Sequence, residues 1–292
     1  MTTLKIPTLQ ALKGTRIVSL ALNLPGPAAL MRCQQMGARC IKLEPPSGDP
    51  MRHYKPAAYA ALHQGIRVMA ADLKTEVGQK VLHQELAKAD VLLTSFRPSA
   101  LTKLGLSWKT LHKKYPQLSQ VAIVGSPGER AEEPGHDLTY LAGVGLVTGL
   151  DLPATLYADM GGSLMASEAV LQVVMHTQRS GKGAYVEVAL ASAAAYLALP
   201  RAWGLTTPGA AIGGGHAGYR IYPCKNGRVA VAALEPHFAA RLCAAAGLAL
   251  DAPQTMFKLE AQQTIAAWLL GKTRAQLDKL AQAKDIPLHT MV

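Results

Sequence analysis

Residues 17–46 read IVSLALNLPGPAALMRCQQMGARCIKLEPP, and this stretch decides the fold. The run Ile17–Leu22 is apolar and begins with β-branched residues, which is typical of a buried strand. A Pro-Gly-Pro turn ends it, and Ala28–Met36 then has the composition of a helix. Cys40–Glu44 is a second predicted strand, which two prolines end. A strand, a helix and a strand within about thirty residues predict a βαβ unit.

The same alternation continues along the chain. We expect helices over Val77–Ala89 and Gly161–Arg179, and strands over Val91–Ser95, Leu118–Val124 and Tyr185–Val188. Strands that alternate with helices form parallel sheets covered on both faces. The sequence therefore predicts the α/β class, with a Rossmann-like, doubly wound parallel sheet.

A Gly-rich stretch, Thr206–Gly218, predicts a boundary between a first domain over residues 1–205 and a second over 206–292. The second domain opens with two short apolar runs around Asn226-Gly227, the signal of a hairpin. The remainder has helical composition, so we expect a small α+β domain. Its expected elements are the strands Tyr219–Tyr222 and Val229–Ala232 and the helices Thr264–Leu270 and Thr273–Ala283.

Composition excludes several classes of protein. Of the 292 residues, 49% are hydrophobic and 17% are charged, which predicts a globular chain with a large core. The first residues lack the apolar core of a signal peptide, and the Ala-rich run Val188–Pro200 is too short to span a bilayer. We expect that run to form a buried helix, and we expect no membrane partner. Four cysteines without a CxxC pair predict reduced thiols and a cytoplasmic protein.

The formal net charge of +11 favours an anionic partner. The basic residues are scattered, and neither zinc-finger spacing nor an aromatic RNA-binding signature occurs. The sequence therefore predicts neither nucleic-acid binding nor a metal site. A phosphorylated ligand remains the interpretation that accounts for the charge.

Three titratable residues lie in otherwise apolar segments: His136, Asp159 and Glu235. Groups of this kind supply proton transfer when their surroundings tune their pKa values. Each also has a structural interpretation, which is the stronger one for any of them alone. The histidine can be a satisfied structural residue, Asp159 can cap a helix opened by Gly161-Gly162, and Glu235 can be a turn acid.

Three arginines flank apolar segments: Arg52, Arg67 and Arg97. Arg97 directly follows a predicted strand, and ligands of open α/β sheets bind at the carboxyl ends of strands. Arginine there can hold a phosphate bidentately, although a solvated loop arginine is an equally good interpretation for each. The turn after the first strand lacks GxGxxG, so no dinucleotide site is predicted.

The chain resembles the class III CoA-transferases (the CaiB/BaiF type), and within them the α-methylacyl-CoA racemase branch. The resemblance covers residues 12 to 292 and rests on an ordered series of short blocks. These blocks are Leu12–Val18, Pro25–Pro27, Gly37-Ala38, Ile41–Pro46, Gly48–Arg52, Ala71–Lys74, Ala89–Leu93, Phe96–Pro98, Gly135–Tyr140, Arg179–Gly183 and Leu234–Phe238.

The resemblance implies roles for the three titratable residues. Asp159 matches the family's aspartate, which is the nucleophile of the transferases. His136 and Glu235 match the racemase branch, in which a histidine and the aspartate face opposite sides of the thioester α-carbon and a glutamate supports the histidine. A helix that begins at Gly161-Gly162 would offer N–H groups to the developing oxyanion.

The resemblance also implies a CoA site on the first domain. We expect Arg97, Arg67 and Arg52 to bind CoA, together with Asp137 and Tyr140. Coenzyme A would be part of an acyl-CoA substrate, and no permanently bound cofactor is expected.

Three functions remain open at this point. The first is epimerisation of a 2-methylacyl-CoA, the second is CoA transfer through Asp159, and the third is acyl-CoA binding without strong catalysis. The third follows from a shortened connection between Tyr140 and Asp159 and from the family's C-terminal returning arm, which the resemblance implies is missing. We expect a homodimer, with the helix over Val188–Leu199 offering the contact.

Overall fold

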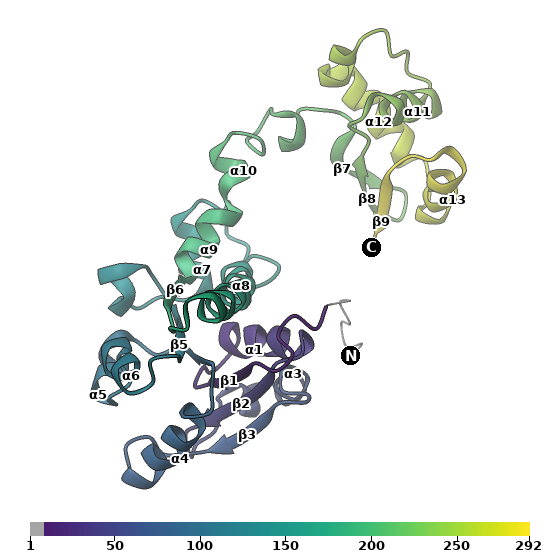
Figure 1. Ribbon diagram of the computed structural model, residues 1–292. Coiled ribbons are helices and arrows are strands. Elements are labelled where there is room, and N and C mark those ends of the chain that lie inside the picture. The colour runs from purple at the N-terminus through teal and green to yellow at the C-terminus, as the bar shows by residue number, and fades with distance from the viewer. Residues whose placement is uncertain (1–8) are drawn as a thin grey trace. The chain divides into compact units, whose positions relative to one another are not determined.

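The computed structural model describes residues 9–292, which divide into two compact units (Figure 1). The first unit ends at Ala198 and the second runs from Leu199 to Val292, so the boundary predicted at residue 206 lies inside the second unit. Each unit has its own sheet and its own hydrophobic core. The two are therefore described one at a time.

The first unit is built on a six-stranded sheet in which every pair of neighbouring strands is parallel. The strands lie in the order β3-β2-β1-β4-β5-β6, so the direction of winding reverses between β1 and β4. The class α/β with a doubly wound parallel sheet is confirmed. The strands are β1 (Arg16–Ser19), β2 (Arg39–Glu44), β3 (Arg67–Ala70), β4 (Val91–Thr94), β5 (Ser119–Val124) and β6 (Tyr185–Ala189).

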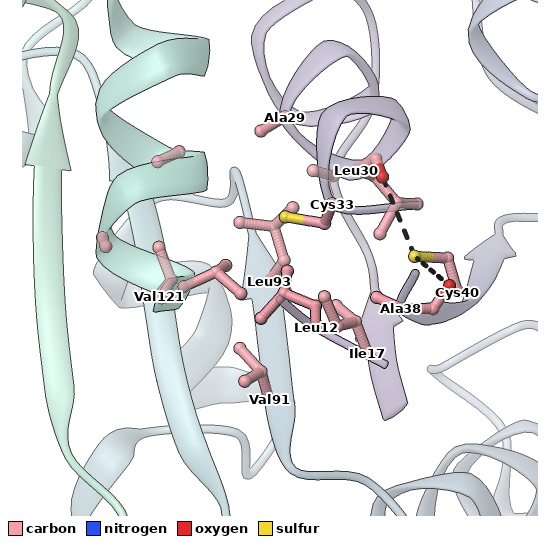
Figure 2. Close-up of a cluster of buried hydrophobic side chains, with 14 of the residues drawn as sticks. Leu12, Ile17, Ala29, Leu30, Cys33, Ala38, Cys40, Val91, Leu93 and Val121 are labelled. Atoms are coloured by element: carbon pink, nitrogen blue, oxygen red, sulfur yellow. Dashed lines mark hydrogen bonds between the residues drawn. The ribbon is translucent and has the colours of Figure 1, made fainter. Parts of the chain in front are cut away.

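Helices cover both faces of this sheet. Their bounds are α1 (Pro25–Gln35), α2 (Met51–Tyr54), α3 (Pro56–Leu62), α4 (Glu76–Leu86), α5 (Pro98–Lys103), α6 (Trp108–Lys114), α7 (Asp137–Gly143), α8 (Tyr157–Ser180) and α9 (Leu190–Leu197), with a short 3-10 helix over Gly128–Glu132. Side chains of α1 and α8 form one core with the sheet, and side chains of α4, α5 and α6 form the core on the other face. Figure 2 shows the first core, where Cys33 of α1 meets Leu93 and Val121 of the sheet.

The cysteines of this core are buried thiols. Cys33 is fully buried, and burial raises its pKa well above the usual range. Burial likewise raises the pKa of Cys40 to about 12, and its Sγ lies 3.7 Å from the carbonyl oxygen of Leu30 (Figure 2). All four cysteines are free, as the sequence predicted, and these two remain protonated at neutral pH.

Three features of the first unit differ from the expectations. β3 was not predicted, because only one of its four residues is even partly buried and it lies at the edge of the sheet. α8 begins at Tyr157, four residues before the predicted start at Gly161. α9 is not a buried helix, because only Ala193 and Ala194 of it are buried and Tyr196 is 64% exposed.

The glycine pair inside α8 has a packing reason. A Cβ on Gly161 would come within 3.1 Å of Leu197 Cδ1, and a Cβ on Gly162 would collide with the side chain of Leu190. The glycine pair therefore lies inside the helix and lets α9 approach it closely. It does not mark the helix start.

The second unit holds a three-stranded antiparallel sheet in the order β7-β8-β9. The hairpin of β7 and β8 is confirmed. β9 was not predicted, because the sequence over 288–291 has helical neighbours and no alternating pattern; it is held by pairing with β8. The elements are β7 (Tyr219–Cys224), β8 (Gly227–Ala232), β9 (Leu288–Met291), α10 (Leu199–Ala202), α11 (Pro236–Ala246), α12 (Leu259–Leu270) and α13 (Arg274–Lys284), with 3-10 helices over Ala211–Gly213 and Pro253–Phe257.

Candidate active site

The candidate site lies at the carboxyl edge of the large sheet, where the winding reverses between β1 and β4. In doubly wound sheets this reversal opens the crevice that ligands occupy. Here the loops after the two strands meet, because the Leu22 N–H donates to Ser95 Oγ at 3.2 Å. Arg97 was predicted at this edge, and the structure agrees, since Arg97 follows β4 and directly precedes α5.

Asp159 lies in the first turn of α8, and Asp137 holds it there. The backbone N–H of Asp159 donates to Asp137 Oδ1 at 2.9 Å. Asp137 is itself the first residue of α7 and is only 5% exposed. A buried carboxylate thus satisfies an otherwise free N–H group of one helix while it begins another. The structure gives Asp137 this positioning role, and its contact with CoA stays a prediction.

His136 precedes Asp137 at the N-cap position of α7. Its backbone N–H donates to Thr139 Oγ1 at 3.1 Å, and the same hydroxyl donates to the His136 carbonyl oxygen at 2.7 Å. The imidazole is exposed to solvent. The motif GHDLTY therefore fixes the backbone of His136 and leaves its side chain accessible.

The carboxyl group of Asp159 has an altered proton affinity. Burial raises its pKa from 3.8 to about 6, and the negative charge of Asp137 contributes in the same direction. His136 lies close enough to act in the opposite direction. The three side chains therefore form one electrostatic cluster, with a carboxyl group that exchanges protons near neutral pH.

Tyr140 extends this cluster. A Cβ on Gly135 would come within 2.6 Å of its ring, and a Cβ on Gly125 would collide with its hydroxyl, so two glycines form the space that the ring occupies. Burial raises the pKa of Tyr140, Asp159 raises it further and Arg97 lowers it. Asp159 and Arg97 thus both lie within electrostatic range of the Tyr140 hydroxyl.

Tyr54 is a neighbour of Asp159 that the sequence reasoning missed. It is the last residue of α2 and is 62% exposed. Burial of its hydroxyl raises its pKa, and the charges of Asp49 and Asp159 raise it further. The only signal in the sequence was its place two residues after Arg52, which ends a block shared with the family.

A buried ionic network supports the loop that carries α2. Lys42 is fully buried in β2, and its Nζ lies 2.5 Å from Asp49 Oδ2 and 3.1 Å from Glu44 Oε1. Asp49 accepts hydrogen bonds from the N–H groups of Met51, at 2.9 Å, and Asn23. The lysine thus ties β2 both to the start of α2 and to the loop after β1.

His63 completes the network. Its Nε2 lies 2.9 Å from Lys42 Nζ, and its Nδ1 lies 2.7 Å from the Tyr59 carbonyl oxygen. Burial lowers the pKa of His63, so the neutral ring accepts from the lysine and donates to the carbonyl. Glu44, Asp49 and His63 converge as metal ligands do, but the Lys42 ammonium lies among them and supplies the positive charge.

The two other predicted arginines occupy different places. Arg52 is exposed on α2, and its guanidinium lies 5.9 Å from the centre of the Tyr59 ring. Arg67 is the first residue of β3, at the amino end of the strand. It therefore lies at the edge of the sheet opposite to Arg97, and the geometry does not support a phosphate clamp that the two would share.

A groove of about 900 Å³ lies beside the carboxyl edge, between the start of α4 and α5. Three lysines line it, together with the apolar side chains of Leu73 and Leu104. These lysines were not predicted to bind a ligand, although the first of them ends the block Ala71–Lys74. They are Lys74, Lys80 and Lys103.

The predicted oxyanion donors need correction. The Met160 N–H already donates to the Leu156 carbonyl oxygen at 3.0 Å, so the helical ladder of α8 begins before Gly161. The N–H groups of Gly161 and Gly162 lie inside the helix and are not free to bind an anion. The backbone N–H groups that precede the first helical hydrogen bond of α8 are those of Tyr157 and Ala158.

Glu235 belongs to the second unit, where it precedes α11 and is exposed. Its support of His136 stays a prediction. Within residues 9–292, no helix is both long enough and apolar enough to cross a bilayer.

Comparisons with known proteins place the chain in a family. It matches CoA-transferase family III over residues 12–291. It is 30% identical to the α-methylacyl-CoA racemase of Mus musculus over 275 residues, which are 88% of this chain and 68% of the racemase. It is 31% identical to the cinnamoyl-CoA:phenyllactate CoA-transferase of Clostridium sporogenes over 204 residues, and this match spans only 50% of the transferase and 63% of this chain.

Solved structures show the same fold. A hypothetical protein from Mycobacterium tuberculosis superposes with a TM-score of 0.84 at 23% identity, over 95% of this chain and 84% of its own. A CaiB/BaiF family protein from Brucella suis gives a TM-score of 0.80 at 24% identity, over 96% of this chain and 84% of its own. The match to the family covers nearly the whole chain, and its relatives include both racemases and CoA-transferases. The chain therefore belongs to CoA-transferase family III.

Proposed function

We propose that this protein epimerises a 2-methylacyl-CoA by moving the proton on the α-carbon of the thioester. The observation that carries the proposal is the pairing of Asp159, whose pKa is raised to about 6, with the accessible imidazole of His136. A carboxyl group that exchanges protons near neutral pH, paired with an accessible imidazole, suits a reaction in which either group removes the proton. The resemblance to the racemase branch, which implies a histidine in this role, also supports the proposal.

The chemistry follows from these two groups. One of them, as a base, takes the α-proton, and the electron pair of the C–H bond moves into the thioester to form an enolate. The other, as the conjugate acid, returns a proton to the opposite face of the carbon. Nothing is consumed, and the two residues exchange protonation states. Tyr140 and the free N–H groups at the start of α8 are the nearby donors that would stabilise the enolate oxygen.

CoA would bind along the carboxyl edge as part of the substrate. Its phosphates would meet the three lysines of the groove and Arg97, and the apolar side chains of Leu73 and Leu104 suit the adenine ring. No permanently bound cofactor enters this proposal. Replacing Arg97 by alanine should weaken CoA binding measured by calorimetry.

The second candidate is CoA transfer between carboxylic acids. The relatives that are CoA-transferases favour it, and it uses the same aspartate. The Asp159 carboxylate would attack the acyl thioester and release CoA thiolate, which would then attack the aspartyl anhydride to give an aspartyl-CoA thioester and free acid. An incoming acid would reverse these steps. The exposed fraction of Asp159 permits such an attack.

Deuterium incorporation separates the candidates. In deuterated water without an added acid, the wild type should introduce deuterium at C2 of a 2-methylacyl-CoA. His136→Ala should abolish exchange from one stereoisomer and leave partial exchange from the other, with a loss of ~10²–10⁴ in rate for the affected face. Glu129→Gln, an exposed change on the same unit, is the control and should leave the rate unchanged.

The other outcomes are equally informative. Absence of deuterium exchange, combined with CoA movement between acids and a hydroxylamine-sensitive adduct on Asp159, would establish the transferase instead. CoA binding without exchange or transfer over a broad panel of acyl-CoA thioesters would favour a binding protein.

A further inference from the structure

The opposite edge of the large sheet carries a cluster of arginines that the proposed function does not use. Three neighbouring strands each begin with an arginine: Arg16 on β1, Arg39 on β2 and Arg67 on β3. All three line one cavity of about 220 Å³ at the amino ends of these strands. We infer that this cavity binds a small ligand that carries a phosphate or diphosphate group.

Strand register explains why three side chains from different strands meet there. Arg16 lies beside Arg39 across β1 and β2, and Arg67 lies beside Ile41, two residues after Arg39. Side chains alternate between the faces of a strand, so register partners and residues two apart share a face. The three guanidiniums therefore emerge on the same face of the sheet.

The charge in the cavity is not balanced. Among the described residues, Glu85 of α4 is the one acidic residue that lines the cavity, and its Oε2 lies 3.7 Å from the Arg16 guanidinium. Asp90 lies next to the cavity and accepts a hydrogen bond from the backbone N–H of Arg16 at 2.7 Å. Within residues 9–292, the guanidiniums of Arg39 and Arg67 have neither a hydrogen bond nor an ion pair. Even with both acids counted, the three arginines leave one positive charge in excess.

The cavity has the chemistry of an oxyanion site. Arginine presents a planar fork of donors that matches the oxygens of phosphate, and two unpaired forks on adjacent strands can hold one anion from two sides. Val18 and Ile41, whose side chains share the arginines' face of the sheet, also line the cavity and give it an apolar wall. An anion there would relieve the repulsion among three like charges held together by the sheet.

Two other positively charged places on this unit serve different purposes. The lysine-lined groove lies at the carboxyl edge and belongs to the CoA proposal, and Lys42 is buried and fully paired. The arginine cavity stands apart from both, because its strands present their amino ends. The inference is independent of the proposed function.

Pyrophosphate titration of the 292-residue chain tests the site. The arginine Nε–Hε signals in nitrogen-15 NMR show which guanidiniums bind the anion. Calorimetry gives the affinity. Pyrophosphate should shift the signals of Arg39 and Arg67. The double variant Arg39→Gln/Arg67→Gln should weaken binding by roughly tenfold or more, because each charge-assisted contact is lost.

Matched variants distinguish specific binding in the arginine cavity from non-specific attraction of the anion to a basic protein. Arg179→Gln removes one charge from the exposed end of α8 and should change the affinity by less than about twofold, since distant surface charges are screened. Arg39→Lys keeps the charge but loses the fork, and should weaken binding while leaving the thermal midpoint unchanged. Malonate, a dianion without phosphorus, should bind more weakly than pyrophosphate.

Four results would overturn the inference. The first is unchanged affinity in the double variant, and the second is an equal loss in Arg179→Gln. The third is a loss confined to Lys74→Gln, which would place the anion in the groove at the other edge. Failure of pyrophosphate to bind at millimolar concentration would also overturn it. None of these results bears on deuterium exchange at C2, so the two proposals fail separately.

Discussion

At the scale of single residues, Asp137 sets both the position and the proton affinity of Asp159. It accepts the Asp159 N–H at 2.9 Å, and its charge is the second cause, after burial, of the raised pKa. One side chain thus couples the geometry of the helix start to the chemistry of the residue that it holds. A carboxylate suits this double role better than the serine or threonine commonly found at helix starts.

Asp137→Asn should therefore change the chemistry without changing the geometry. The amide oxygen can still accept the Asp159 N–H, while the negative charge that raises the pKa of Asp159 is gone. Asp159 acts as base or nucleophile only when ionised, so activity falls as the pH drops through its pKa of about 6. We expect this acid limb of kcat/KM to move to lower pH in the variant.

A carbon-13 titration of the Asp159 carboxyl gives the same quantity without a substrate. Glu129→Gln, which also removes one negative charge, is the matched control and should leave the titration where it is. A midpoint that is unmoved, or moved upward, in Asp137→Asn would contradict the electrostatic account.

Lys42 is the residue on which the loop before α2 depends. It is fully buried with Glu44 and Asp49, which are 3% and 0% exposed. Replacing it by methionine would keep the volume but leave two buried carboxylates without their cation. Removing one partner of a buried ionic network typically costs ~3–5 kcal/mol. Urea unfolding of Lys42→Met should show a loss of that order.

The control for this change is Lys109→Met, because Lys109 is exposed on α6. Its effect should stay within about 0.5 kcal/mol, as for most surface substitutions. A loss below ~1 kcal/mol in Lys42→Met would mean that the carboxylates find other partners or take up protons.

At the scale of elements, the two glycines around Tyr140 decide where the start of α7 can lie. Gly135→Ala would add a Cβ within 2.6 Å of the ring, so Tyr140 must leave its place beside Asp159. Overpacking of this kind typically costs ~1–3 kcal/mol. We expect that loss in urea unfolding together with a reduced rate of deuterium exchange.

Gly143→Ala is the matched control on the same helix. A Cβ there meets nothing within 4 Å, and alanine is the better helix former. This variant should be as stable as the wild type or slightly more so. Equal destabilisation by both substitutions would show that the space around Tyr140 is not what Gly135 protects.

Among the strands, the sequence predicted those that are buried on both faces and missed two that pairing holds in place. β4 and β5 are buried along their whole length, so each has a continuous apolar run that predicts a strand. β3 and β9 have few buried residues, and only their hydrogen-bonded neighbours make them strands. The start of α8 was misplaced because glycines were interpreted as a helix start when they serve contact with α9.

The candidate site shows the same division. Four site residues could be identified from the sequence because they lie in short motifs: His136, Asp137, Tyr140 and Asp159. Lys42 could not be recognised, because an alternation of lysine and glutamate in a strand ordinarily indicates a solvated face. Its partners come from residues 44, 49 and 63, and only the fold brings these together.

At the scale of the whole molecule, two separate cores account for the division into two units. One core joins α1, α8 and the large sheet, and another lies among the elements that follow Leu199. Each unit buries its own apolar face, which is what an independently packed domain requires. A predicted dimer contact must therefore lie on an apolar surface that neither unit buries in its own core.

The exposed side of α9 is such a surface, and the homodimer, which stays a prediction, would form its contact there. Tyr196 is 64% exposed and Leu197 is 41% exposed on an Ala-rich helix, and a twofold axis can pair such a face with itself.

Light scattering at micromolar concentration should give twice the chain mass of 30.9 kDa. Tyr196→Glu should return the mass to that of one chain, because a buried, unpaired carboxylate opposes association. Met175→Glu adds the same charge at a 49% exposed position on α8 and should leave the dimer intact. A wild-type monomer, or a dimer that Tyr196→Glu does not weaken, would exclude α9 as the contact.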